Sequence, residues 1–452
     1  MMVRWIAAVA LLAATPLVAV AFEPASSRFD APAGVRLVHV PEPEPVALPE
    51  SASLAPPLTL DALIEMAFQH NPTLAMAAAR IGAARGAQVQ AGLYPNPMVG
   101  YSGMEMGNEG TPGMQGAIIG QRIITGGKLR LDQAIAGRQV AESNCLFHAQ
   151  EQRVLSDVRV RFHVALVAQE RLNVTQQLVR IGDDLGRATE QLVEGRQAAE
   201  NDLLQARIEA EQARILLDNS HNEYIEAWRR LAAVVGVRAL APASLAGNTE
   251  EVTPEYDWDE CHRLVLAGNP ELAAARQRVE RLRLTVVRAR RENVPNLDLM
   301  VGIRHAYMTD SDTVGVEVGM PIPILNRNQG NISRAQCETV MAIKEVERIE
   351  LDLQDRLAVA YRRYRNAAQQ VQRYQASILP PARRSLDLVT RGYESGQVEY
   401  LALLIAQRTY YQVHLAYLTA LQEWRTSAAV IEGQLLTGSL GSAAIPMSES
   451  AD

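Results

Sequence analysis

The chain has 452 residues, with 44 Lys and Arg against 51 Asp and Glu, and a formal net charge of −7. Charges of both signs are interspersed, so the sequence lacks the basic patch that binding to nucleic acid requires, and no nucleic-acid partner is expected. Gly and Ala are frequent whereas Phe occurs only 5 times, which favours closely packed, slender helices over a thick aromatic core.

The first residues have the pattern of an export signal. Arg4 precedes an uncharged run rich in Ala, Val and Leu, and Ala19-Val20-Ala21 matches the small-x-small site of signal peptidase. We therefore expect residues 1–21 to be a cleaved signal peptide. The alternative, an uncleaved membrane anchor, is disfavoured because the apolar run is short and contains Thr and Pro. No cysteine stands beside the cleavage site, so an N-terminal lipid is not expected.

The remaining chain carries the same series of segments twice. The first copy opens at Asn71-Pro72 and the second at Asn269-Pro270. Each copy continues with a helical stretch, two short alternating segments and a very long polar/apolar stretch. The predicted division is a Pro-rich extended arm at 22–57, a first repeat at 58–236, a linker at 237–256, a second repeat at 257–436 and a flexible tail at 437–452.

Each repeat contains one predicted β-hairpin. Glycine-rich alternating segments occupy 97–124 in the first repeat and 297–322 in the second, and a turn-forming loop divides each pair. The predicted strands are about ten residues long, which is the length of a tilted strand that crosses a membrane.

Very long helices follow each hairpin. A proline-free stretch predicts a helix from about Lys128 to Glu194, which would be on the order of 100 Å long. Apolar residues alternate at steps of three and four on both sides of Gly195 and of Gly396, so each glycine is predicted to mark the tip of an antiparallel helical hairpin. The pair Pro380-Pro381 predicts a kink or a new helix start within the second hairpin.

The four predicted strands explain why several chains should combine. Four strands cannot close a barrel, and open sheet edges are not tolerated in hydrocarbon. Three chains would share about twelve strands and a matching ring of long helices. The predicted fold class is therefore mainly α and internally duplicated, with long helical hairpins that form a trimeric α-barrel and a shared membrane β-barrel, four strands per protomer.

Over roughly 58–436 the sequence resembles the TolC-like outer-membrane efflux channels. The resemblance rests on the two Asn-Pro openings, Pro-Asn-Pro at 95–97, Gln-Arg-Ile-Ile-Thr-Gly-Gly-Lys at 121–128 and the two hairpin tips. The run Pro-Ile-Pro-Ile-Leu-Asn-Arg-Asn-Gln-Gly at 321–330 is most similar to the heavy-metal efflux branch, of the cobalt–zinc–cadmium or copper/silver type.

This resemblance implies a passive homotrimeric conduit in the outer membrane that extends into the periplasm. An inner-membrane pump of the resistance–nodulation–division type would drive export, and a periplasmic adaptor would join the pump to the conduit. The tips that would dock the adaptor are Glu194, Gly195, Arg196, Ser395, Gly396 and Gln397. The two glycines have an alternative role as turn residues with positive φ.

The sequence is also compatible with a gate residue and with two other functions. The family often has acidic residues beyond the tips, and Asp202 occupies that place in the first repeat, whereas the matching stretch of the second repeat has no carboxylate. Alternatively, Asp202 is a solvated residue in the first turn of a helix. The chain could also be the exit duct of a type I protein-secretion or multidrug system, or a periplasmic coiled-coil scaffold without a pore.

The sequence offers no catalytic, cofactor or metal motif. Its eight His and three Cys are scattered without metal-ligand spacing, and Gly126-Gly127-Lys128 lacks the other residues of a phosphate loop. Methionines cluster near the predicted strands, either as a soft-metal pathway or as lipid-facing and gap-filling side chains: Met98, Met104, Met106, Met114, Met300, Met308 and Met320. Tyr94, Tyr101 and Tyr307 either join an interfacial aromatic girdle or simply pack.

Overall fold

The structure is a computed structural model that describes residues 57–107, 110, 112–196, 199–247, 255–395 and 397–441. All of them belong to one unit, Ala55–Asp452. The predicted signal peptide, the predicted arm up to residue 56, the tail beyond residue 441 and the tip residue Gly396 lie outside the described residues.

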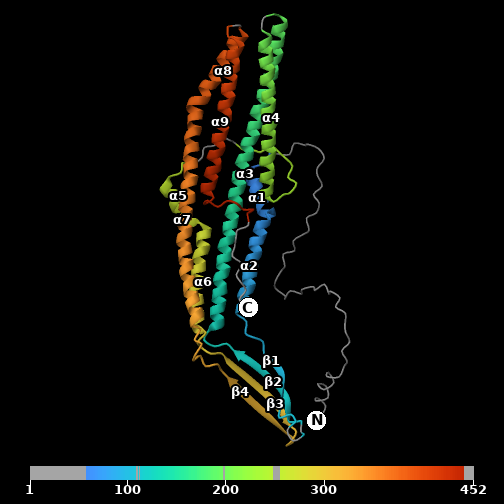
Figure 1. Cartoon of the computed structure of the whole chain (residues 1–452), viewed down its shortest axis with the longest axis vertical. Helices are drawn as coiled ribbons and strands as arrows, with labels where there is room; N and C mark the ends of the chain where they lie inside the picture. The colour runs from blue at the N-terminus through green and yellow to red at the C-terminus, as the bar shows by residue number, and fades with distance from the viewer. Residues whose placement is uncertain are drawn as a thin grey trace, which may run out of the picture. The chain divides into compact units, whose positions relative to one another are not determined.

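The same order of elements occurs twice along the chain (Figure 1). The first series is α1 (Leu60–His70), α2 (Pro72–Ala91), β1 (Met98–Met104), β2 (Met114–Ile123), α3 (Lys128–Glu194) and α4 (Glu200–Val235). The second is α5 (Trp258–Gly268), α6 (Pro270–Arg291), β3 (Leu297–Ala306), β4 (Ser311–Gly319), α7 (Gln329–Arg373), a π-helix (Tyr374–Ile378), α8 (Leu379–Glu394) and α9 (Tyr400–Glu432). A mainly helical, internally duplicated fold with a small sheet is thus confirmed.

The long helices begin and end where the sequence predicts. Helix α3 has 67 residues, and Lys128 and Glu194 are its first and last. In the second repeat the long helix widens into the π-helix directly before α8, whose first turn contains Pro380 and Pro381. Proline removes a backbone donor and its ring crowds the preceding turn, which accounts for the interruption. Among the described helices, none is long and apolar enough to cross a membrane.

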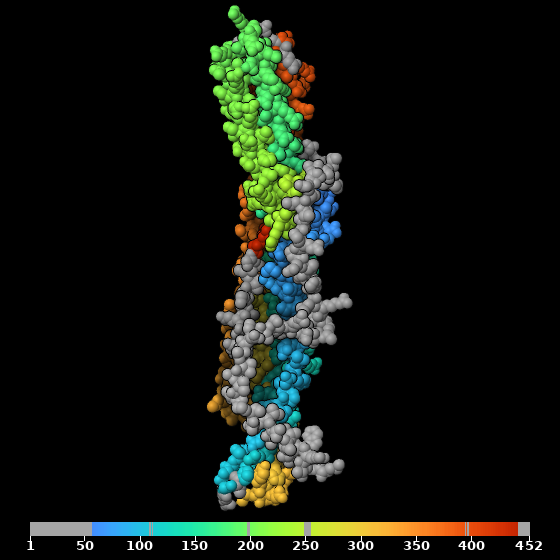
Figure 2. All heavy atoms as spheres, turned by 90° about the vertical axis from the view of Figure 1, so that its right-hand side faces the viewer, coloured from blue at the N-terminus to red at the C-terminus, as the bar shows by residue number. Residues whose placement is uncertain are grey.

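The two β-hairpins join into one antiparallel sheet with the strand order β1-β2-β3-β4. The central pair, β2 with β3, comes from different repeats, and its register runs from Met114 opposite Ala306 to Ile123 opposite Leu297. The sheet lies at one end of the helices and the two helical tips lie at the other, as Figure 1 and Figure 2 show. Strands and tips are therefore separated by the length of α3.

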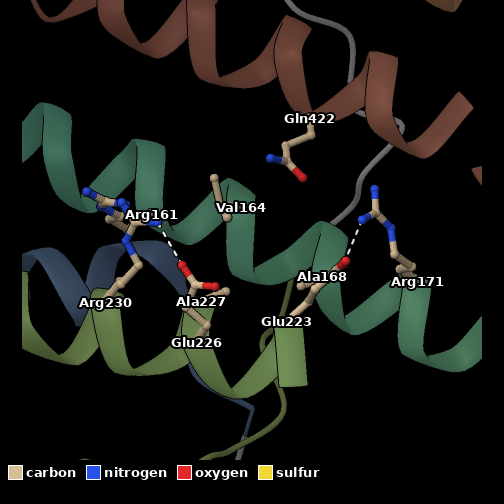
Figure 3. A pocket seen from close by; sticks show the side chains of 9 residues that line it. All are labelled: Arg161, Val164, Ala168, Arg171, Glu223, Glu226, Ala227, Arg230 and Gln422. Atoms are coloured by element: carbon tan, nitrogen blue, oxygen red, sulfur yellow. Dashed lines mark hydrogen bonds and ion pairs between the residues drawn. The ribbon is translucent and has the colours of Figure 1, made fainter. Parts of the chain in front are cut away.

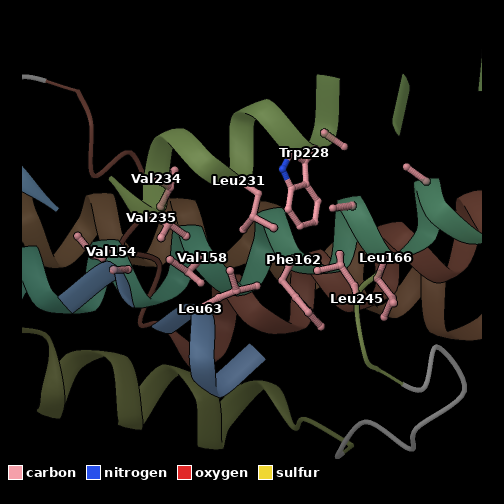
Figure 4. Close-up of a cluster of buried hydrophobic side chains, with 14 of the residues drawn as sticks. Leu63, Val154, Val158, Phe162, Leu166, Trp228, Leu231, Val234, Val235 and Leu245 are labelled. Atoms are coloured by element: carbon pink, nitrogen blue, oxygen red, sulfur yellow. The ribbon is translucent and has the colours of Figure 1, made fainter. Parts of the chain in front are cut away.

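Each repeat has its own apolar core, where a short helix packs against the long hairpin. In the first repeat, Leu63 of α1, Phe162 of α3 and Trp228 of α4 are buried together (Figure 4). The indole Nε1 of Trp228 donates a hydrogen bond to the carbonyl oxygen of Leu240, 2.8 Å away, so the polar atom of this large side chain is satisfied. The second repeat has an equivalent cluster of α5, α7 and α9 residues, which includes Val265.

The asparagines of the two Asn-Pro motifs are buried, and each makes a helix cap and a long-range hydrogen bond. The side-chain oxygen of Asn71 accepts a hydrogen bond from the backbone N of Thr73, 2.9 Å away, and caps α2. Its Nδ2 donates to the carbonyl oxygen of Val234 in the last turn of α4, at 2.7 Å. Asn269 caps α6 in the same way and donates to the carbonyl oxygen of Gln434 after α9, at 3.1 Å. Each motif thus ties the entry helices to the end of the long hairpin.

Replacing Asn71 with Ala should lower the free energy of unfolding by about 2–3 kcal/mol. The variant loses a helix cap and leaves a buried carbonyl oxygen without its partner. Asn71 is only 3% exposed, so water cannot substitute. Thr59→Ala is the matched control, because Thr59 caps α1 at an exposed site and should cost less than half as much. Thermal unfolding followed by circular dichroism in detergent measures the stability of both variants. Equal losses of stability would show that the hydrogen bond from Asn71 to Val234 does not contribute.

A partly buried histidine makes stability depend on pH. Burial, together with the guanidinium groups of Arg425 and Arg159, lowers the pKa of His163 in α3 from 6.5 to about 4. Between these values the unfolded chain binds a proton that the folded chain does not, so stability is complete above pH 6.5 and declines as the pH falls. Lowering the pH from 7 to 5.5 should cost about 1 kcal/mol through this group. His163→Gln should show a correspondingly smaller decline in thermal unfolding, and an unchanged decline would contradict this assignment.

Candidate functional site

The sheet has two chemically different faces. Side chains alternate between the faces of a strand, and cross-strand partners share a face. One face, here the apolar face, exposes large apolar side chains whose exposed fractions run from 52% to 76%: Val99, Tyr101, Ile119, Ile303, Val314, Val316 and Val318. The opposite face, here the polar face, carries Ile118 and several methionines among residues that are mainly small or polar. The small or polar ones are Gly100, Ser102, Gly116, Arg122, Asp298, Gly302, Arg304, Thr313, Gly315 and Glu317.

Two arginines on the polar face are bonded across strands. Arg122 Nε lies 2.7 Å from Asp298 Oδ1, and Arg304 Nε donates to Ser102 Oγ at 3.1 Å. The apolar face carries one such contact at the end of β3 and β4, where His305 Nδ1 lies 3.0 Å from Asp312 Oδ1, whereas the residues named above for this face are all apolar. The apolar face of the sheet is therefore suited to contact with lipid and the polar face to contact with water, as in membrane strands that line a pore.

The methionines and tyrosines of the strand region divide between these faces. Met98, Met104, Met114 and Met300 lie on the polar face. Tyr101 lies on the apolar face and is 66% exposed. Tyr94 and Tyr307 are also exposed, at 66% and 49%, rather than packed into the fold.

The sheet has two outer strands. In the described part of the chain, β1 pairs only with β2, and β4 pairs only with β3. Each outer strand thus presents a row of backbone donors and acceptors that another chain can pair with.

A buried lysine joins the sheet to the helices. Lys128, the first residue of α3, is 2% exposed, and its Nζ donates to Asn296 Oδ1 at 2.9 Å and lies 3.5 Å from Glu292 Oε1. Gly126 and Gly127 precede it with φ values of 66° and 69°, in the left-handed region that favours glycine. The Gly-Gly-Lys run of the first repeat therefore docks onto the helix-to-strand turn of the second. The sequence analysis used this run as part of a family motif and excluded a phosphate loop, but it missed this contact between the repeats.

The first tip is a tight turn in which Arg196, not Gly195, has positive φ. Gly195 has a φ of −74° and its N donates to the carbonyl oxygen of Gln191 at 3.0 Å, whereas Arg196 has a φ of 58°. The prediction of a left-handed glycine is thus wrong here, because the α-helical hydrogen bonds of α3 continue one residue further. Glu194, Gly195 and Arg196 are consecutive at this turn, and Gly195 and Arg196 are exposed.

The second tip follows α8. Ser395 is exposed and its Oγ donates to the carbonyl oxygen of Gly392 at 3.1 Å, while the backbone N of Gln397 donates to the same oxygen at 2.8 Å. Gly396 lies outside the described residues, so the prediction of positive φ there is not tested. The described side chains at both tips do not form a catalytic site.

Asp202 lies in the first turn of α4, close to the second repeat. Its Oδ2 accepts a hydrogen bond from the backbone N of Ala199 at 3.3 Å, as an acidic residue at a helix start does.

Burial and the nearby groups of Tyr393, Glu209 and Asp202 raise the pKa of Tyr400 to about 12. Sequence reasoning missed Tyr400, whose hydroxyl is buried without a hydrogen-bond partner in the described chain and lines a pocket of about 190 Å³ between the two helical hairpins.

A second groove, of about 210 Å³, lies between α3, α4 and α9 (Figure 3). Its charged side chains are mostly paired: Arg171 lies 2.6 Å from Glu223, and Arg230 lies 2.9 Å from Glu226. Within the described ranges no group of three or more His, Cys, Asp or Glu side chains is placed to hold a metal ion. The groove offers neither a nucleophile beside a base nor an oxyanion site, so its geometry supports no catalytic reaction.

A two-faced sheet with open edges, joined to helical hairpins of this length, defines a channel-forming membrane protein. A family description of outer membrane efflux proteins matches residues 63–237 and 262–435. The chain therefore belongs to the outer membrane efflux protein family, and it is an outer-membrane efflux channel rather than an enzyme.

Individual relatives agree with this assignment. The chain is 27% identical over 384 residues to the cobalt-zinc-cadmium resistance protein CzcC of Cupriavidus metallidurans, covering 84% of this chain and 90% of that protein. Its fold is similar to that of CusC, with a TM-score of 0.66, 19% identity and coverage of 84% and 92% of the two chains. It is also similar to the outer membrane protein VceC of Vibrio cholerae, with a TM-score of 0.67, 17% identity and coverage of 84% and 96%.

Proposed function

We propose that three copies of this chain form one passive conduit that crosses the outer membrane and extends into the periplasm. The observation that carries the proposal is the four-stranded sheet, which has an exposed apolar face and two outer strands with open edges. Such a sheet is stable in hydrocarbon only when sister chains complete a closed barrel. The long helical hairpins continue the same ring as an α-barrel.

The proposed conduit receives its substrate from an inner-membrane pump of the resistance–nodulation–division type through a periplasmic adaptor. The adaptor docks on the two helical tips, at Glu194, Gly195 and Arg196 and at Ser395, Gly396 and Gln397. Asp202 lies beyond the first tip, where its carboxylate can face the narrowing end of the tube and act at a gate. Residues 58–236 and 257–436 form the two repeats, and residues 1–21 direct export without lipidation.

Heavy-metal cations are the proposed substrate class. The support is the similarity to CzcC, whose name describes resistance to cobalt, zinc and cadmium. The alternative is the exit duct of a protein-secretion or multidrug system. Deleting the gene should raise sensitivity to salts of these three metals more than sensitivity to a panel of drugs, and the reverse pattern would favour the alternative.

One experiment tests the conduit itself. Protein extracted from outer membranes in detergent should have the mass of a trimer by light scattering, and it should form steady conducting pores in a planar lipid bilayer. Material that is monomeric and remains in solution without detergent would refute the proposal and would instead fit a coiled-coil scaffold.

A further inference from the structure

The polar face of the sheet has a small hollow above Gly120. This glycine is buried in β2, and its cross-strand partners are Met98 of β1 and Met300 of β3. A Cβ placed on Gly120 would lie 3.5 Å from Met98 Cε and 3.5 Å from Met300 Cγ. Two thioether side chains, one from each repeat, therefore cover the same glycine, and the hollow between them has room for a Cβ.

The surroundings of this hollow suit a cation. Glu317 of β4 pairs with Met300 in the same row and shares the polar face, so a carboxylate stands beside the thioethers. In the next row Arg122 is held by Asp298, and its positive charge is therefore already balanced. Met98 is 52% exposed, so it does not act as an ordinary gap-filling residue of a core.

We propose that Met98 and Met300 form a binding site for a soft monovalent cation, Cu(I) or Ag(I), with Glu317 supplying the balancing charge. Thioether sulfur is a soft, neutral ligand that selects such ions, whereas zinc prefers imidazole, thiolate and carboxylate. Neutral sulfur also needs no deprotonation, so binding should be nearly independent of pH. The site exists within a single chain, and only its position inside the pore rests on the proposed function.

The test is a titration of the full chain in detergent, labelled with [methyl-¹³C]methionine, with silver nitrate in chloride-free buffer. The methyl resonances of Met98 and Met300, assigned by single replacements with Leu, should shift together along one saturable binding curve. Met341 is the matched control, because it is 70% exposed on α7, away from the sheet, and should shift only at much higher Ag(I). Zinc ions should move neither Met98 nor Met300.

Two variants separate a built site from adventitious binding to exposed sulfur. Met300→Leu conserves size and should weaken the Ag(I) response of Met98 by about tenfold or more. Gly120→Val keeps both thioethers but fills the hollow, and it should weaken the response similarly. A Met98 response that is unchanged in Met300→Leu, or that matches the response of Met341, would overturn the proposal. The pore assay on the same wild-type sample distinguishes failure of this site from failure of the conduit.

Discussion

Val316→Arg should prevent assembly of the channel. Val316 is 66% exposed on the apolar face of the outer strand β4, where the proposed barrel meets lipid. An arginine near the middle of the bilayer costs about 2–4 kcal/mol, and a trimer carries this cost three times. Heat-resistant trimers in outer-membrane fractions, detected on gels after mild detergent extraction, should fall below about a tenth of the wild-type amount.

Thr313→Arg is the control for this change. Thr313 lies on the same strand, but its side chain is on the polar face, opposite Arg304. The same residue placed there faces water in the proposed pore, so trimers should persist while the conductance of the pore falls. Equal loss of trimers in both variants would contradict the assignment of the two faces.

Gly195→Trp combined with Ser395→Trp should abolish pump-dependent efflux without loss of trimers. Both residues are exposed at the tips and have φ values of −74° and −88°, which any residue can adopt. The large side chains should therefore block docking of an adaptor hairpin rather than disturb folding. Metal sensitivity of cells should rise to that of the deletion strain, while the purified variant should conduct normally in bilayers.

Gly86→Trp serves as the control for the tip variants. Gly86 is an exposed residue of α2, and a Cβ there would meet no atom within 4 Å. It carries the same added bulk away from the tips and should leave efflux intact. Normal metal resistance in the double tip variant, with trimers present, would show that the adaptor docks elsewhere.

The sequence predicts the helices and the strand pairs well because their signals are local. Proline placement and apolar spacing are enough to bound α3 at Lys128 and Glu194 and to locate the break before α8. The Asn-Pro motifs are also readable as helix starts. Their second role could not be predicted, because the contact from Asn71 to Val234 joins residues far apart in the chain.

Non-local pairing limits the prediction of the candidate site in the same way. Two separate hairpins are visible in the sequence, but the pairing of β2 with β3 that merges them is not. This register places Met300 beside Gly120, opposite Met98 of the first hairpin. Burial of Lys128 similarly depends on Asn296 of the other repeat. At the tip, the choice between Gly195 and Arg196 for the left-handed residue depends on where α3 ends, to within one residue.

The two open sheet edges also bear on how the channel matures. Among the described residues, strand pairing inside one chain ends with β2 against β3, and in the proposed trimer the edges of β1 and β4 pair with other chains. In this proposed arrangement, a newly exported copy has no stable place in the bilayer before it associates with other copies. Insertion and association then coincide in the proposed trimer, so the yield of mature channel should rise more steeply than in proportion to the rate of synthesis. Low expression should leave unassembled chains exposed to periplasmic proteases.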